Sequence, residues 1–164
     1  MALRGTIAVA ILVPLLGTAT AAADQPGPTP HRPDTAKILV ASIGYLTVKE
    51  KEAIAFRRLQ TELMVAALSC GRQEYRSKYN TFVLRYRPAL RRNGRTLHAI
   101  FKRNFGNGGK RRLEGYVTRL ANEASVRSMQ RSEFCAVAGR KLDAVLAASR
   151  SATARGLLRR AQNH

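Results

Sequence analysis

The chain has 164 residues, a length typical of one domain. It carries 29 lysines and arginines against 10 aspartates and glutamates, and this formal net charge of +19 favours anionic partners. Its two cysteines have no histidine near them, which argues against a metal site, and no cofactor motif or catalytic residue set is predicted.

The first 23 residues have the three parts of a secretory signal. Arg4 supplies the positive charge, an apolar stretch covers residues 7–16, and small residues lead to an alanine-rich end at 21–23. The apolar stretch is shorter than the ~20 residues that a membrane-spanning helix needs. We therefore predict cleavage between Ala23 and Asp24, and a mature periplasmic or secreted protein without a transmembrane segment.

Residues 24–36 contain four prolines and almost no apolar side chain, which predicts an extended, poorly ordered leader. We expect the folded domain to cover residues 37–149. It begins with a short apolar patch at 38–46, which periodicity assigns neither to a strand nor to a helix. A short helix or an extended segment packed on the rest of the domain is expected there.

The first long helix is predicted to begin after Thr47. Thr47 and Glu50 have the spacing of a capping box, in which each side chain bonds to the backbone of the other residue. The helix should run to Cys70 and end at Gly71, a residue favoured just after a helix. Its apolar side chains recur every three or four residues, as on a helix that buries one face: Phe56, Leu59, Leu63, Ala66 and Cys70.

A second helical stretch is predicted over residues 77–105. When the stretch is projected at ~100° per residue, one arc of it is apolar. That arc carries Tyr79, Phe82, Val83, Tyr86, Leu90, Leu97, Ile100 and Phe101. Pro88 interrupts the stretch, so we expect a bend or a break between Arg85 and Pro88. Glycines at 106, 108 and 109 should end it.

Two further helices are predicted, at 110–129 and at 132–149, the latter with Ser132 as its N-terminal cap. Residues 150–164 are too polar and too poorly patterned to assign, and are expected to form a basic C-terminal tail. Because no alternating run suggests a strand, the predicted fold is all-α, a small bundle of about four amphipathic helices.

The two cysteines are predicted to form an interhelical disulfide. Cys70 lies at the end of the first apolar stripe and Cys135 at the start of the last one. An exported chain reaches a compartment where disulfides form and persist. Two separate buried thiols are the alternative.

A cationic segment lies in the middle of the chain, where twelve basic residues and no acidic one stand between Glu74 and Glu114. On the helical projection most of them lie opposite the apolar arc, and such a face attracts polyanions. The predicted anion-binding residues are Arg85, Arg91, Arg92, Arg95, Lys102, Arg103, Lys110, Arg111 and Arg112. The partner classes are an anionic polymer, anionic lipid head groups or an acidic protein. A solvated face that only maintains solubility is the alternative.

Residues 106–112 (GNGGKRR) superficially resemble a phosphate-binding loop before a helix, but they lack the spacing of that motif, and we expect an interhelical turn. Catalysis has little support. His98 has no acidic or nucleophilic neighbour in sequence and is interpreted as a surface residue. Glu62 and Glu123 lie in helices, so a small periplasmic hydrolase using a helix-borne glutamate is the second hypothesis. More simply, Arg58 and Arg119 would hold these two carboxylates.

About half of the chain resembles a group of small, uncharacterised exported bacterial proteins. The resemblance rests on segments 62–70, 79–83 and 116–125 and on Phe134 with Cys135. It implies an exported helical domain with two cysteines, and the group has no known activity to carry over.

Overall fold

The computed structural model describes Val40, Ala41 and residues 43–163, which all belong to one compact unit. The predicted signal and leader lie outside these residues. Apart from the two helical residues Val40 and Ala41, the described part contains one 3-10 helix, six α-helices and no strand, so the predicted all-α class is confirmed and the predicted number of about four helices is too low. The α-helices are α2 (Val48–Ser69), α3 (Gln73–Arg85), α4 (Arg87–Phe105), α5 (Gly109–Gln130), α6 (Phe134–Leu146) and α7 (Ala154–Gln162).

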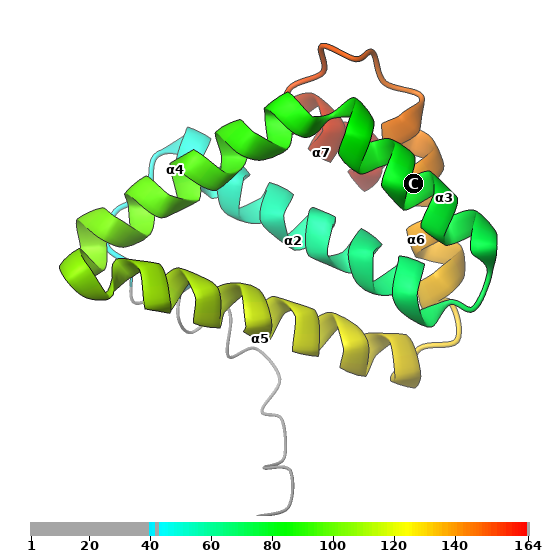
Figure 1. The fold of residues 1–164 in the computed structure, drawn as a ribbon, viewed down its shortest axis with the longest axis horizontal. Helices are drawn as coiled ribbons and strands as arrows, with labels where there is room; N and C mark the ends of the chain where they lie inside the picture. The colour runs from blue at the N-terminus through cyan, green and yellow to red at the C-terminus, as the bar shows by residue number, and fades with distance from the viewer. Residues whose placement is uncertain (1–39, 42, 164) are drawn as a thin grey trace, which may run out of the picture. The chain divides into compact units, whose positions relative to one another are not determined.

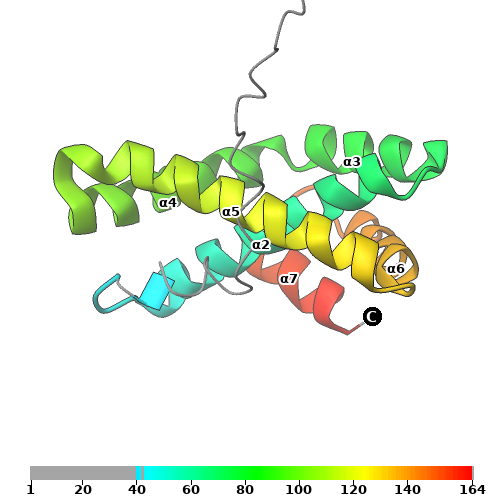
Figure 2. The same ribbon diagram turned by 90° about the horizontal axis from the view of Figure 1, so that it is seen from below.

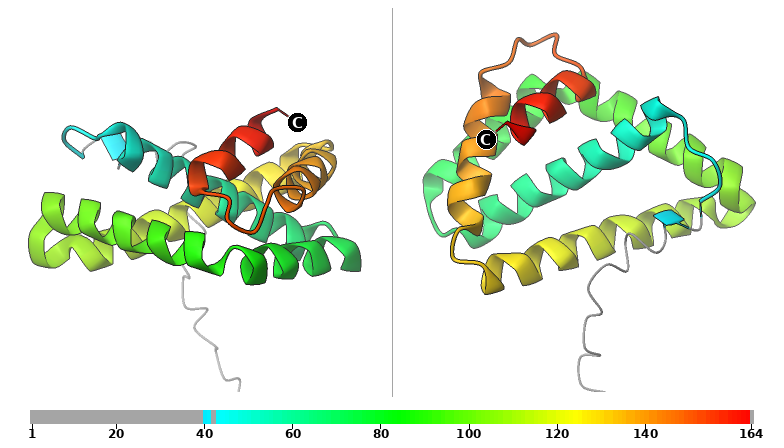
Figure 3. Two further views of the ribbon diagram at one scale, coloured as in Figure 1. Left: turned by 90° about the horizontal axis from the view of Figure 1, so that it is seen from above. Right: turned by 180° about the vertical axis from the view of Figure 1, so that it is seen from behind.

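Helix α2 is the central element, because it contacts each of the other five α-helices. Figure 1 shows α4 and α5 on two sides of it, and the view from behind in Figure 3 shows α6 beside its C-terminal end. Helix α7 lies against the first half of α2, where Arg155 pairs with Glu52. The largest buried cluster joins Phe56 and Leu63 of α2 to Phe82, Leu142 and Leu157. A second cluster joins α2 to α4 and α5. Helix α2 therefore buries more than one of its faces, and the single apolar stripe predicted from the sequence describes only one of them.

The capping box predicted for α2 is present. The Glu50 backbone N–H donates to the Thr47 hydroxyl oxygen at 3.3 Å, and the Thr47 backbone N–H donates to the Glu50 carboxylate at 2.9 Å. Gly71 follows the C-terminal cap with a φ of 69°, a conformation that costs glycine little. Both predicted ends of this helix are confirmed to within about one residue.

The break predicted near Pro88 is confirmed, because the expected second helix is divided at Tyr86 into α3 and α4. Pro88 lies in the first turn of α4, where its missing N–H leaves no helical hydrogen bond unmade. The buried Tyr86 hydroxyl lies 2.7 Å from the Val145 carbonyl oxygen and 2.9 Å from that of Ala148. Tyr86, at the break, therefore also holds the end of α3 against the end of α6.

The last three helices differ from their predicted positions by different amounts. Helix α5 agrees with the prediction to within one residue at each end. Ser132 does not cap α6, because residues 132 and 133 form a turn and Glu133 occupies the cap position without a side-chain bond to the helix. The segment expected as a basic tail instead contains α7, with Leu157, Leu158 and Ala161 buried in the largest cluster.

The predicted disulfide joins Cys70, the C-terminal cap of α2, to Cys135 in the first turn of α6. The two Cα atoms are 5.7 Å apart, and 65 positions separate the residues in sequence. Val65, Ala66, Ala124, Phe134 and Ala138 form a buried cluster against which both cysteines pack. Such a bond fits a periplasmic or extracellular protein.

The apolar patch ahead of α2 packs on the domain. Val40 and Ala41 are helical, Ile43 is buried in the cluster with α4 and α5, and the Gly44 N–H donates to the Asn104 side-chain oxygen at 3.3 Å. Tyr45 remains exposed. The patch thus covers the apolar surface where α4 meets α2.

Candidate anion-binding surface

Helix α4 presents a row of cationic side chains to solvent. Arg91, Arg95 and Lys102 are exposed and fall within about 40° of one another around the helix axis. The opposite side of α4 buries Leu97 and Ile100. From Arg91 to Lys102 the row is about 16 Å long at 1.5 Å per residue. The cationic face predicted for this helix is therefore exposed over roughly three turns.

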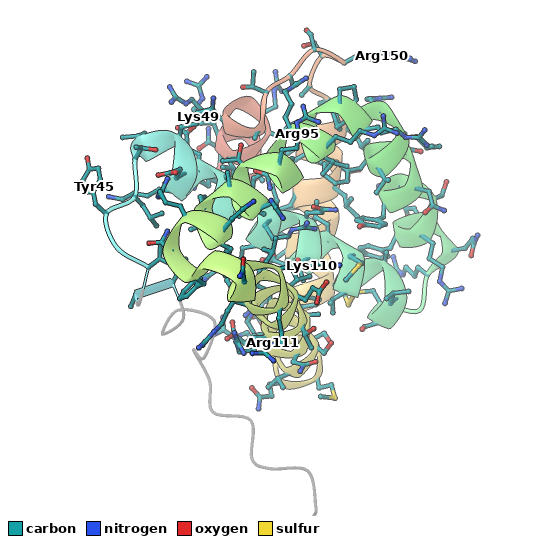
Figure 4. All side chains as sticks on the ribbon, turned by 60° about the vertical axis from the view of Figure 1, so that its left-hand side comes forward. Tyr45, Lys49, Arg95, Lys110, Arg111 and Arg150 are labelled. Carbon is teal, nitrogen blue, oxygen red and sulfur yellow. A yellow bond between two sulfur atoms is a disulfide. The ribbon has the colours of Figure 1, made fainter. Side chains whose placement is uncertain are left out.

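The corner between α4 and α5 continues this row. A single 3-10 turn, η1 (Gly106–Gly108), joins the two helices, so residues 106–112 form the expected interhelical turn. Lys110 and Arg111 lie exposed in the first turn of α5. Figure 4 shows Arg95, Lys110 and Arg111 on the same side of the described residues. In Figure 2 the linked ends of α4 and α5 lie together, away from α6.

Three of the nine predicted anion-binding residues make contacts within the domain. Arg85 donates to the Leu146 carbonyl at the end of α6. Arg103 forms an ion pair with Glu50, with 2.6 Å between Nη1 and Oε1. The Arg112 guanidinium lies 5.4 Å from the centroid of the Phe105 ring. These three positions already have structural roles.

The other six predicted residues are exposed, and no carboxylate of the described part pairs with them. They are Arg91, Arg92, Arg95, Lys102, Lys110 and Arg111. We call these six side chains the cationic surface. Lys49 of α2, which is not among the nine predicted residues, lies beside it, since it lines one cleft together with Arg92 and Arg95. In the sequence, Lys49 stands between Thr47 and Glu50, which indicate the start of a helix and nothing about an anion site.

Glu50 neutralises Arg103, the cationic residue that follows Lys102 on α4. The hydrogen bond from Arg103, followed by the one from the Thr47 backbone, lowers the pKa of Glu50 from 4.5 to about 2. Because folding lowers this pKa, charged Glu50 stabilises the fold above about pH 4.5. That contribution is lost as the pH falls toward about 2.

We expect Glu50→Ala to lower the free energy of unfolding by about 1 kcal/mol at neutral pH, because it removes the capping box and the Arg103 ion pair. The difference from the wild type should shrink between about pH 4.5 and pH 2, as urea denaturation at several pH values can measure. Glu50→Gln is the control, since glutamine keeps the capping bond and removes only the charge. A difference that does not change with pH would contradict this account.

The residues considered for catalysis do not form one site. Glu62 lines a cleft of about 430 Å³ between α2, α6 and α7, and its carboxylate accepts from Lys141 Nζ at 2.6 Å rather than from the expected Arg58. Glu123 does not line this cleft. His98 is exposed on α4. A two-carboxylate mechanism therefore gains no geometric support from this cleft.

No group of three or more His, Cys, Asp or Glu side chains in the described part is arranged to hold a metal ion. None of its helices combines the length and apolar character needed to cross a membrane.

Comparison of the sequence with protein-family models, with curated proteins and with solved structures gives no match. A function can therefore be inferred only from the chemistry of the cationic surface itself.

Proposed function

We propose that this protein is an exported binding or structural module whose cationic surface holds an anionic polymer of the cell envelope or the exterior. The supporting observation is that six exposed cationic side chains lie along α4 and the start of α5 without a carboxylate partner in the described part. A surface used only for solubility has no need to keep its charges in one row.

An extended polymer suits this surface better than a small ligand. The row on α4 is about 16 Å long before it turns the corner to Lys110, so several charges of one chain can be held at once. Binding would release counterions from the polymer, which makes the affinity strongly dependent on salt. Export supports a partner outside the cytoplasm, and both the predicted cleavage after Ala23 and the disulfide between Cys70 and Cys135 are consistent with export.

The test uses heparin as a model polyanion. We expect Arg91→Gln/Lys110→Gln/Arg111→Gln to bind heparin at least tenfold more weakly at ~0.1 M NaCl. The plot of log affinity against log salt should also become less steep, by about 2 to 3 in slope. Affinity chromatography with a salt gradient, followed by calorimetry at three salt concentrations, measures both.

The matched control is Arg72→Gln/Arg76→Gln/Arg131→Gln, which removes the same three charges from exposed positions outside the cationic surface. It should keep most of the affinity, because these side chains do not belong to the row. If both triple variants lose affinity equally, the attraction depends on net charge alone and the cationic surface is not the binding site. If the wild type is not retained at low salt, the proposed function is wrong.

A further inference from the structure

A cleft of about 600 Å³ lies where the start of α2, the middle of α4 and the start of α7 meet. Its ionic and amide lining consists of Lys49, Glu52, Arg92, Asn93, Arg95 and Arg155. Figure 4 shows Lys49 and Arg95 on the two sides of α7, which is drawn in red. Three segments that are far apart in sequence thus bring their polar groups to one place.

The lining of this cleft is cationic. Glu52 is its one acidic residue, and the Glu52 carboxylate is bonded to Arg155, with 2.6 Å between Nε and Oε1. Lys49, Arg92 and Arg95 have no carboxylate partner in the described part. Four cationic side chains against one carboxylate leave a formal charge of +3 on the lining. An anion is therefore the ligand that this cleft favours.

Asn93 gives independent evidence for a ligand. Asn93 is one of the lining residues, it is only 5% exposed, and its Nδ2 has no hydrogen-bond partner among the described residues. Buried polar groups in native proteins are nearly always hydrogen-bonded. An acceptor oxygen of a bound ligand would satisfy the Asn93 carboxamide.

The start of α7 adds backbone donors. The Gly156 N–H donates to the Thr153 hydroxyl oxygen at 3.3 Å, and the Leu157 N–H to the Thr153 carbonyl at 3.0 Å. The N–H groups of Ala154 and Arg155, which line the same cleft, lie outside the helix's own hydrogen bonding. The N-terminus of a helix favours negative charge, and phosphate most of all because it has several acceptor oxygens.

We propose that this cleft is a binding site for a single phosphate group, carried either by a small phosphomonoester or by a lipid head group. The planar guanidinium groups of Arg92 and Arg95 suit the geometry of phosphate oxygens, and Lys49 adds a third charge. The site goes beyond polymer binding on the open surface, because it is a cleft with a buried amide and helix N–H donors. A phosphate oxygen bound there would give the Asn93 Nδ2 a hydrogen-bond acceptor.

The test is calorimetric titration with inorganic phosphate at ~0.15 M NaCl, where weak surface attraction is screened. We expect Asn93→Ala to weaken phosphate binding about tenfold without a change in net charge. Arg92→Gln/Arg95→Gln should weaken it at least as much and does not alter a buried position. Lys110→Gln/Arg111→Gln, which removes two charges outside the cleft, should leave it within about twofold.

Two vesicle preparations separate the sources of the phosphate. Vesicles of phosphatidylcholine with phosphatidic acid present a phosphomonoester on a membrane, and vesicles of phosphatidylcholine alone do not. Binding of the first preparation that is lost in Asn93→Ala identifies a lipid head group, whereas binding of inorganic phosphate alone identifies a small phosphomonoester.

The proposal is wrong if the wild type binds neither probe, or if both double variants weaken binding equally. The heparin test changes Arg91, Lys110 and Arg111, none of which lines this cleft, so either proposal can fail without the other.

Discussion

Replacement of both cysteines, as Cys70→Ala/Cys135→Ala, should lower the free energy of unfolding by about 2–4 kcal/mol. The disulfide joins the end of the central helix α2 to the start of α6 across 65 positions of sequence, so its loss gives the unfolded chain much more conformational freedom. This is a large share of the ~5–15 kcal/mol that stabilises a typical domain. Urea denaturation of the wild type and the double variant measures the difference.

Reduction supplies the control for this experiment. Dithiothreitol should destabilise the wild type to nearly the level of the double variant, and it should leave the variant unchanged. The cationic surface lies on α4 and the start of α5, which do not contain either cysteine, so heparin binding of the folded variant should persist. Equal stability of the reduced and oxidised wild type would show that the bond contributes nothing.

Gly109→Ala should lower the free energy of unfolding by about 1–3 kcal/mol. A Cβ atom at this position would lie 2.7 Å from the Phe101 carbonyl oxygen and 2.8 Å from the Lys102 Cα atom. These are backbone atoms of α4, so they cannot move aside as the end of a flexible side chain can. The α4–α5 corner would have to open, as denaturation with urea and a changed near-ultraviolet dichroism spectrum would report.

Gly108→Ala is the matched control, because a Cβ atom there has no neighbour within 4 Å and its φ of −77° is ordinary for alanine. It should be neutral or slightly stabilising, since alanine reduces the freedom of the unfolded chain. Because Lys102 and Lys110 lie on the two sides of this corner, we also expect Gly109→Ala to weaken heparin binding more than Gly108→Ala does. Equal stability of the two variants would mean that the contact between α5 at Gly109 and the α4 backbone has room for a Cβ atom.

The elements that were predicted well have strong local signals. The start of α2 follows from Thr47 and Glu50, which are three residues apart and cap the helix without help from other segments. The break between α3 and α4 follows from Pro88, because proline acts on the backbone within its own turn. The disulfide followed from two apolar stripes that each contain one cysteine.

Helix α7 was missed because its stability comes from packing. It has nine residues, and an isolated helix of that length is marginal in water. The weak signals were Thr153 as a cap and the spacing of Leu157, Leu158 and Ala161 on one side. Burial of those three side chains against α2 and α6, which the sequence does not reveal, decides the outcome.

The candidate site was predicted only in part, because some of its contacts join different helices. The helical projection selected Arg91, Arg95 and Lys102, because one helix determines which side they face. It could not show that Arg103 pairs with Glu50, a residue 53 positions earlier, or that Arg85 bonds to the end of α6. The cleft around Asn93 is formed by three helices and has no signature within any one of them.

The packing of the last helix, α7, on the first long helix, α2, determines when the domain can fold during synthesis. Helix α2 is covered by α7, so the principal core stays incomplete until residues 157–161 have left the ribosome. Under the export proposed above, a chain still under synthesis would therefore reach the secretion machinery without a finished domain, open enough to thread through a narrow channel. It would acquire its final form on the far side, where Cys70 and Cys135 would be oxidised.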